Sequence, residues 1–300
     1  MNFCFFILKS VILRIKSELL ASGGGNQMNM KKRESHWHGT NAIMNASQVI
    51  LELEGINGQL LSDCIDPTEV SFIQKCAKPN KKTILHDYIE DVYYFQLEYV
   101  LDKHFPMEII KDLKELLDFY HVDFSELGDF QYFEYEDEDL DYEETIVAEE
   151  YAWKLLKFFW ENIGELVVDD IFTVLYGNRH FMFEFNTQLA EIVLKLKHND
   201  YPDYLKKDGV FKRGYIPKWL QNGVFMRDKG RCQVCSVNLS KILNIDDNEN
   251  YDHIIPLEIG GTNDPVNFQL TCERCNKSKG AKNIGFNSLA NRYWKFDLNK

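Results

Sequence analysis

The stretch Tyr251–Gly280, YDHIIPLEIGGTNDPVNFQLTCERCNKSKG, decides the fold of the C-terminal part of this chain of 300 residues. Residues 251–257 form a β-branched and aromatic run that predicts a strand, and Gly260-Gly261 supplies a turn that is free of Cβ constraints. Residues 266–270 predict the returning strand, and a short helix follows it. The stretch therefore predicts a ββα unit.

Four polar residues of this unit have the chemistry of a metal-assisted site. In a ββα arrangement, the carboxylate of Asp252 and the amide oxygen of Asn276 can meet as hard ligands for a cation such as Mg2+. His253 has an ordinary pKa near neutrality and is suited to take a proton from an attacking water. Asn267 fits a positioning role, in which its amide binds backbone and keeps the loop of His253 in place.

Together these residues resemble the motif of the HNH nucleases. The resemblance implies that His253 is the general base, that Asp252 is a metal ligand and that Asn267 is structural. It makes Asn276 the second metal ligand, where the founding motif has His and many members have Asn. An amide oxygen suits Mg2+ or Mn2+ better than Zn2+ or Ni2+, so the departure shifts the expected metal without implying inactivity. The resemblance covers roughly residues 213–285 and includes the lead-in FMRDKGRCQVC.

Two Cys-x2-Cys pairs, separated by 36 residues, predict a second metal site. Four thiolates in two such pairs meet the tetrahedral demand of a structural Zn2+, with no position left for a catalytic water. Four buried free cysteines would leave the pairing unexplained, and disulfides fit a chain of this size and cysteine pattern less well than thiolates in a reducing cytoplasm. The predicted zinc ligands are Cys232, Cys235, Cys272 and Cys275.

Charge is divided unevenly along the chain, whose formal net charge is −13. From Phe211 onward there are 14 Lys and Arg against 9 Asp and Glu, a net charge of +5. Residues 1–210 hold 20 basic against 38 acidic residues, a net charge of −18. The basic part can therefore approach nucleic-acid phosphates, whereas the acidic part would repel them unless it faces away.

We expect three regions. Residues 1–30 are an apolar, Gly-rich leader that charges interrupt, so it predicts neither a transmembrane helix nor a signal peptide; an amphipathic helix that docks on a partner or membrane is the alternative. Residues 31–205 predict a mainly α, acidic domain of unknown role, and residues 206–300 predict the small α+β nuclease domain. The predicted helices of the chain cover about 66–77, 83–104, 106–120, 145–163, 166–176, 181–197, 217–228 and 288–297.

The densest acidic run, EYEDEDLDYEE at Glu134–Glu144, permits three interpretations. It is a solvated linker, a patch that docks a protein partner, or a mimic of nucleic acid that shields the nuclease. The first is the usual behaviour of such runs.

Basic residues around the motif are candidates for phosphate contacts, although each is equally well explained as ordinary surface charge. Lys279 lies one helical turn beyond Asn276 and is expected to face the same groove. The candidates are Arg231, Lys277, Lys279 and Lys282, with Arg213 and Arg227 before the motif.

The sequence favours a cytoplasmic, metal-dependent endonuclease that hydrolyses DNA phosphodiester bonds, with RNA not excluded as a substrate. Structural Zn2+ and catalytic Mg2+ or Mn2+ are the expected cofactors. A role in restriction or anti-phage defence is the first biological hypothesis, with homing or DNA repair as alternatives. A competing hypothesis from another class is a catalytically inactive, zinc-stabilised module that binds nucleic acid or protein.

Overall fold

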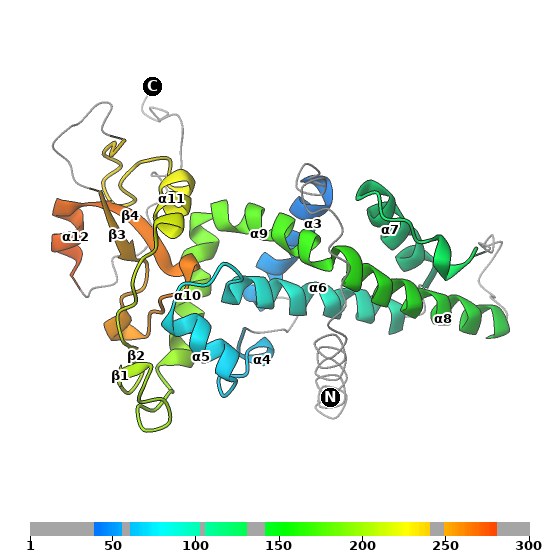
Figure 1. The fold of residues 1–300 in the computed structure, drawn as a ribbon, viewed down its shortest axis with the longest axis horizontal. Coiled ribbons are helices and arrows are strands. Elements are labelled where there is room, and N and C mark those ends of the chain that lie inside the picture. Colours follow the sequence, from blue (N-terminus) through cyan, green and yellow to red (C-terminus); the bar gives the residue numbers. More distant parts are fainter. Residues whose placement is uncertain (1–38, 56–60, 103–105, 131–141, 241–248, 281–300) are drawn as a thin grey trace. The chain divides into compact units, whose positions relative to one another are not determined.

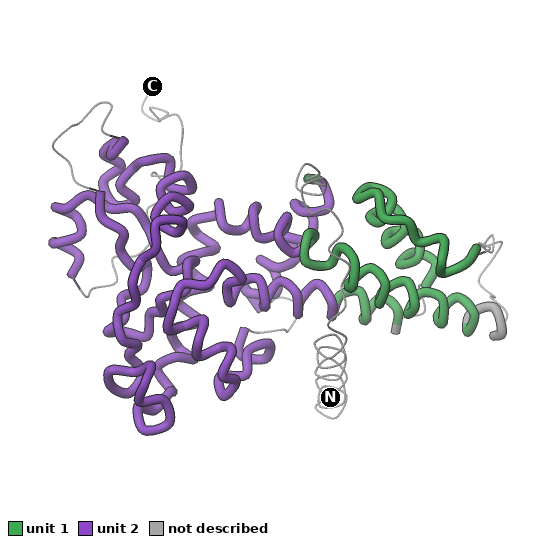
Figure 2. Tube along the Cα trace, in the orientation of Figure 1, with its two compact units in different colours: residues 1–39, 96–167 green, residues 40–95, 168–300 purple. Residues whose placement is uncertain are grey.

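The computed structural model describes residues 39–55, 61–102, 106–130, 142–240 and 249–280. The leader, most of the acidic run, Lys282 and the predicted helix at 288–297 lie outside the described residues. The chain divides into two compact units, one of residues 1–39 and 96–167 and one of residues 40–95 and 168–300 (Figure 2). Among the described residues, no helix is both long and apolar enough to span a bilayer.

The described part of the smaller unit is helical. It contains α7 (Pro106–Phe119) and α8 (Tyr142–Phe159), which pack together, and the 3-10 turn η1 (Ser125–Leu127). The apolar residues of α7 recur at helical spacing and are buried, as the periodicity of the sequence predicts. Lys114 of α7 lies 5.1 Å from the ring centroid of Tyr151 of α8, a cation–π distance.

The larger unit begins with a group of helices that surrounds α10 (Arg179–Val193). Asn178 caps α10 by accepting a hydrogen bond from the backbone N–H of Phe181 at 3.1 Å, which explains why the helical pattern breaks at Gly177-Asn178. The π-helical segment η2 (Trp160–Gly164) belongs to the smaller unit, where it follows α8. The other helices here are α3 (Gly39–Leu53), α4 (Leu61–Cys64), α5 (Val70–Ala77), the first part of α6 (Ile84–Asp102) and α9 (Glu165–Gly177).

The C-terminal part of the larger unit contains the predicted ββα arrangement (Figure 1). Strand β3 (Glu249–His253) pairs antiparallel with β4 (Phe268–Cys272), and α12 (Glu273–Lys279) follows β4 directly. Before them come a small hairpin, β1 (Leu205–Lys207) with β2 (Val210–Phe211), and α11 (Lys218–Arg227). The fold is therefore mainly α, followed by a small α+β region.

The first strand is shorter than the predicted 251–257. It ends at His253, because the backbone N–H of Ile254 turns to the carbonyl of Asn267. A 3-10 turn, η3 (Leu257–Ile259), then follows Pro256, and η4 (Pro265–Asn267) precedes β4. The apolar core beneath the sheet contains Leu220, Val224, Cys232, Leu239, Phe268, Leu270 and Cys272.

Candidate nuclease site

The four cysteines of the two Cys-x2-Cys pairs form one cluster. Cys232 and Cys235 lie in the turn after α11, Cys272 ends β4 and Cys275 lies in the first turn of α12. Their Sγ atoms all lie within 4.8 Å of one another, and those of Cys235 and Cys272 are 3.8 Å apart. A tetrahedral ion with Zn–S bonds of ~2.3 Å needs sulfur–sulfur separations of about 3.8 Å, so the tetrad fits a structural zinc.

His253 is the last residue of β3, and its side chain points into the protein. The residue is 5 % exposed, and its ring centroid lies 4.5 Å from that of Phe268, its neighbour across the sheet. Burial lowers the pKa of His253 to about 4; the carboxylate of Asp252 opposes this shift, whereas the cations Arg213 and Lys279 add to it. The imidazole is therefore neutral at pH 7, which is the form that a general base requires.

Asp252 carries the carboxylate next to His253, and Lys279 of α12 reaches it. The Nζ atom of Lys279 lies 2.6 Å from Oδ2 of Asp252 and also donates to the backbone carbonyl of His253. The side chain of Lys279 is 1 % exposed, and burial lowers its pKa while Asp252 acts in the opposite direction. A cation thus already binds one oxygen of the carboxylate that the sequence assigns to a metal.

Asn276 lies on α12, which packs against β3 (Figure 1). It precedes Lys279 by three residues, so both belong to one face of the helix. Because Lys279 reaches Asp252, this face is the one directed toward the end of β3. Asn276 is half-buried there. The amide and the carboxylate are both hard oxygen donors, which is the donor type that Mg2+ and Mn2+ prefer.

Asn267 is fully buried, and its side chain bridges the two ends of the loop between the strands. Its Oδ1 accepts from the backbone N–H of Ile255 at 2.8 Å, and its Nδ2 donates to the carbonyls of Ile255 and Thr262, both at 2.9 Å. The amide thus satisfies three backbone groups that would otherwise be buried without partners. This geometry is the one that a positioning residue needs.

Asn263 is a buried residue of the same loop that the sequence analysis does not single out. Its Oδ1 lies 3.3 Å from Nε2 of His253 and accepts from the backbone N–H of Gly214 at 3.0 Å. Its Nδ2 donates to the carbonyl of Ala77, at the end of α5, and to that of Lys212. Three of these partners, Gly214, Lys212 and Ala77, lie far away in the sequence, so local pattern gives no signal for them.

The neighbouring Asp264 ties this loop to the helical part of the unit. Its Oδ1 caps η4 by accepting from the backbone N–H of Val266 at 3.0 Å, and its Oδ2 accepts from that of Ile84, at the start of α6, at 2.9 Å. From α10, Asn186 donates to the carbonyl of Val266 at 3.1 Å. The loop is therefore held by three helices.

A buried group of charges joins α10 to β4. Arg179 donates through Nη2 to Oε1 of Gln269, the residue paired with Asp252 across the sheet, at 2.9 Å. The Asp228 carboxylate lies 2.9 Å from Nε of Arg227 and 3.9 Å from Nη1 of Arg179. Burial and the second guanidinium lower the pKa of Arg179 to about 10. Two cations thus share one buried anion behind the site.

The candidate phosphate contacts differ in accessibility. Arg231 and Lys277 are exposed, with Lys277 paired to Glu273 on the same helix at 2.5 Å. Lys279 is directed inward to Asp252, and the side chain of Arg227 is 2 % exposed and stacks over the ring of Tyr176. Arg231 and Lys277 are therefore accessible for contacts with the phosphate backbone of a nucleic acid.

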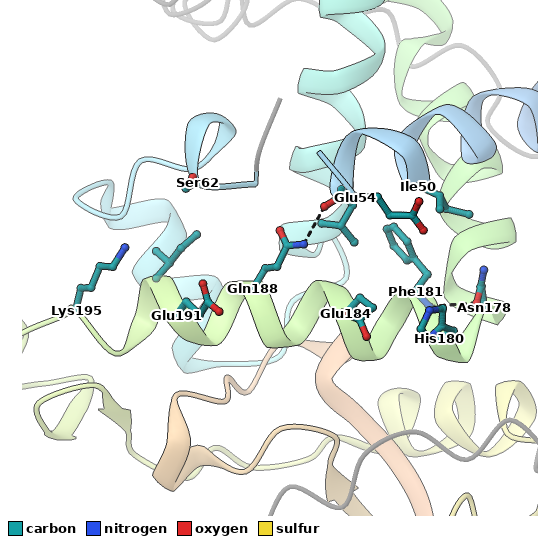
Figure 3. A pocket seen from close by; sticks show the side chains of 12 residues that line it. Ile50, Glu54, Ser62, Asn178, His180, Phe181, Glu184, Gln188, Glu191 and Lys195 are labelled. Atoms are coloured by element: carbon teal, nitrogen blue, oxygen red, sulfur yellow. Dashed lines mark hydrogen bonds between the residues drawn. The ribbon is translucent and has the colours of Figure 1, made fainter. Parts of the chain in front are cut away.

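A cavity of about 540 Å³ lies on the other face of α10, between that helix and α3 and α4 (Figure 3). Phe181, Glu184 and Gln188 of α10 line it, and Gln188 also donates to the carbonyl of Leu53 at 2.8 Å. The α10 residues that contact the loop, such as Asn186, belong to the opposite face. The cavity is thus separate from the end of β3.

A comparison with families of known proteins gives a match for the C-terminal part of the chain. Neither the curated proteins nor the solved structures contain a match to this chain. The family model described as HNH endonuclease matches residues 232–282, which include all four cysteines together with Asp252, His253, Asn267 and Asn276. The segment of residues 232–282 is therefore similar to the HNH endonucleases.

Proposed function

We propose that the protein is a metal-dependent endonuclease that hydrolyses phosphodiester bonds in DNA. The observation that carries the proposal is the placement of a buried, neutral His253 beside the Asp252 carboxylate, at the strand end against which α12 packs. The family match of this segment supports the proposal. The basic residues Arg231 and Lys277 on the surface suit the approach of a phosphate backbone.

In the proposed reaction, His253 takes a proton from a water molecule that attacks the phosphorus. The new P–O bond forms as the bond to the leaving oxygen breaks, and that oxygen takes up a proton from solvent. Asp252 and Asn276 would hold Mg2+ or Mn2+, which when bound supplies positive charge for the phosphate and for the leaving oxygen. Asn267 keeps the loop that follows His253 in place.

Incubation of supercoiled plasmid with the protein and Mg2+ or Mn2+ tests the proposal. We expect nicked and linear products from the wild-type protein and none above background from His253→Ala. The matched control is His180→Ala, which removes an exposed histidine on the cavity side of α10 and is expected to leave cleavage unchanged. Equal cleavage by wild type and His253→Ala would refute the proposal.

One observation favours a second candidate, a zinc-stabilised binding module without catalysis. Lys279 occupies Oδ2 of Asp252, where an ammonium group competes with a metal ion for the carboxylate. Calorimetric titration with Mn2+ separates the two candidates. We expect binding to the zinc-loaded wild type that is lost in Asp252→Ala, whereas a wild type that binds neither Mn2+ nor Mg2+ but still binds DNA supports the second candidate.

We also propose a role in restriction or anti-phage defence, in the cytoplasm. The thiolate tetrad suits a reducing compartment, and the acidic helical part offers a surface for a regulatory partner. Phage plating on cells that express the wild type or His253→Ala is the test. Equal plating efficiency on both strains over a broad phage panel would remove the support for this role.

A further inference from the structure

We infer that Asn263 is the positioning residue of His253: it keeps the proton on Nε2 and leaves Nδ1 as the atom that accepts the proton of the attacking water. The contacts of Asn263 provide the geometry for this inference. Its catalytic consequence rests on the proposed nuclease function. It adds a residue of the loop, and behind it the end of helix α5, to the groups that set up the reaction.

The orientation of the Asn263 amide is determined by backbone groups alone. Two carbonyl oxygens face Nδ2, that of Ala77 at 3.1 Å and that of Lys212 at 2.8 Å. A backbone N–H, that of Gly214, faces Oδ1 at 3.0 Å. Rotating the amide by half a turn would set a donor against this N–H and an acceptor against both carbonyls. Backbone groups cannot exchange donor and acceptor roles, so only one orientation satisfies all three.

This orientation decides the protonation of the histidine ring. Both hydrogens of Nδ2 are used by the two carbonyls, so Asn263 presents only an acceptor, Oδ1, to Nε2 of His253 at 3.3 Å. An acceptor requires a donor opposite, so Nε2 carries the hydrogen when the ring is neutral. The lone pair then resides on Nδ1. The imidazole therefore has one nitrogen bound to the loop and the other available as the base.

The helical part of the unit holds Asn263 in place from behind. Its backbone N–H donates to the carbonyl of Cys76 at 2.7 Å, in addition to the bond from its side chain to Ala77. Asn263 is 0 % exposed, so no water replaces these partners. A Cβ added at Gly214 would lie 3.1 Å from Cγ of Asn263, which shows how closely the backbone encloses the amide. The base is thus aligned through Asn263 by the C-terminal end of α5.

The test is the tautomer of His253, measured by NMR on zinc-loaded protein labelled with 15N-histidine at pH 7.5. The His253 signals are identified by their disappearance in His253→Ala. We expect the wild type to show the Nε2–H tautomer and Asn263→Ala to show a mixture of both tautomers. The matched control is Asn186→Ala, which removes another buried amide that bonds to the same loop but does not contact His253, and which we expect to keep the Nε2–H tautomer.

Two outcomes overturn the inference. One is an Nδ1–H tautomer in the wild type, which decides the matter even if Asn263→Ala does not fold. The other is a folded Asn263→Ala variant that keeps only the Nε2–H tautomer. The expected pattern in a protein that cleaves no plasmid would refute the nuclease proposal and leave the positioning contact intact. In an active enzyme, we expect Asn263→Ala to lower kcat by ~100-fold with KM little changed, the scale of a misplacement of about 1 Å.

Discussion

The side chain of Asn267 stabilises the loop between β3 and β4 through three hydrogen bonds. Its amide pairs with both the N–H and the C=O of Ile255 and with the carbonyl of Thr262. We expect Asn267→Ala to lower the free energy of unfolding by about 3 kcal/mol, since these buried groups lose their partner. The midpoint of urea unfolding measures the change. Asn222→Ala, on the exposed side of α11, is the control and should shift stability by less than about 0.5 kcal/mol.

The depressed pKa of His253 has a consequence for the pH dependence of cleavage. A base must be unprotonated, and the pKa of about 4 keeps the ring neutral well below the ordinary value of 6.5. We expect kcat/KM to stay level as pH falls from 8 to 5.5, whereas an ordinary imidazole would lose about 90 % of its neutral form at pH 5.5. Circular dichroism over the same range controls for unfolding. A tenfold fall in kcat/KM of a folded protein would contradict this prediction.

At the residue level, the sequence predicts those groups whose spacing is itself the signal. The Asp-His pair and the two Cys-x2-Cys pairs are close in sequence, and the cysteine cluster and the family match both follow these patterns. Asn263 and Gly214 are different, because their partnership joins segments 49 residues apart and depends on how the loop meets the helices. Local pattern carries no information about such a contact.

At the level of elements, the zinc cluster connects the turn after α11 to β4 and α12. We expect Cys275→Ser to lower zinc content and to remove the cooperative unfolding of residues 232–282, because the energy of zinc binding is folding energy in sites of this kind. Metal analysis and a thermal melt measure the two effects. Cys64→Ser, a change outside the tetrad, is the control and should keep zinc content unchanged. Full zinc content and an unaltered melt in Cys275→Ser would show that the tetrad is not a structural metal site.

A single buried carboxylate, that of Asp228, supports the contact between α10 and β4 in addition to the hydrogen bond from Arg179 to Gln269. Asp228 is 1 % exposed, accepts from the backbone N–H of Leu270 at 2.7 Å and lies between two guanidinium groups. We expect Asp228→Asn to cost about 3–5 kcal/mol of unfolding free energy, because Arg179 and Arg227 are then left as uncompensated buried charges. The exposed pair of Asp208 with Lys197 provides the control, and Asp208→Asn should lower the free energy of unfolding far less, because solvent screens an exposed ion pair. Similar costs for the two variants would contradict this account.

The order and type of the elements are predicted better than their ends. The apolar spacing of α7 predicts its limits to within a residue, because one face of the helix packs against α8. The predicted end of the first strand, residue 257, lies four residues beyond the end of β3. The N–H of Ile254 bonds to the carbonyl of Asn267 in the loop, and a 3-10 turn follows Pro256. Tertiary hydrogen bonds, not strand propensity, determine that end.

At the level of the whole molecule, residues 206–300 remain a predicted domain whose independence can be tested. The loop between β3 and β4 forms hydrogen bonds with α5, α6 and α10. These three helices lie outside residues 206–300. We therefore expect a zinc-loaded fragment of residues 206–300 to unfold at a lower temperature than the full chain and to cleave plasmid more slowly. Calorimetry and the plasmid assay compare the two. An equal Tm would show that the helices contribute nothing to the stability of the nuclease segment.

Composition predicts the division of charge, and periodicity predicts that the first two thirds of the chain are mainly helical. Neither composition nor periodicity predicts that residues 40–95 group with residues 168–300. This grouping arises from contacts between distant segments, such as that of Ile84 with Asp264. The sequence therefore predicts which residues form the candidate site but does not show which helices support them.

The attachment of Asn263 to the end of α5 also has a consequence for protein synthesis. Domains fold as the chain emerges from the ribosome, with N-terminal segments first, at ~5–20 residues per second. Ala77 and Ile84 leave the ribosome long before the loop that they bind. A nascent chain can thus form α5 and the start of α6 before His253 is translated, so the support for the histidine exists before the proposed nuclease site does.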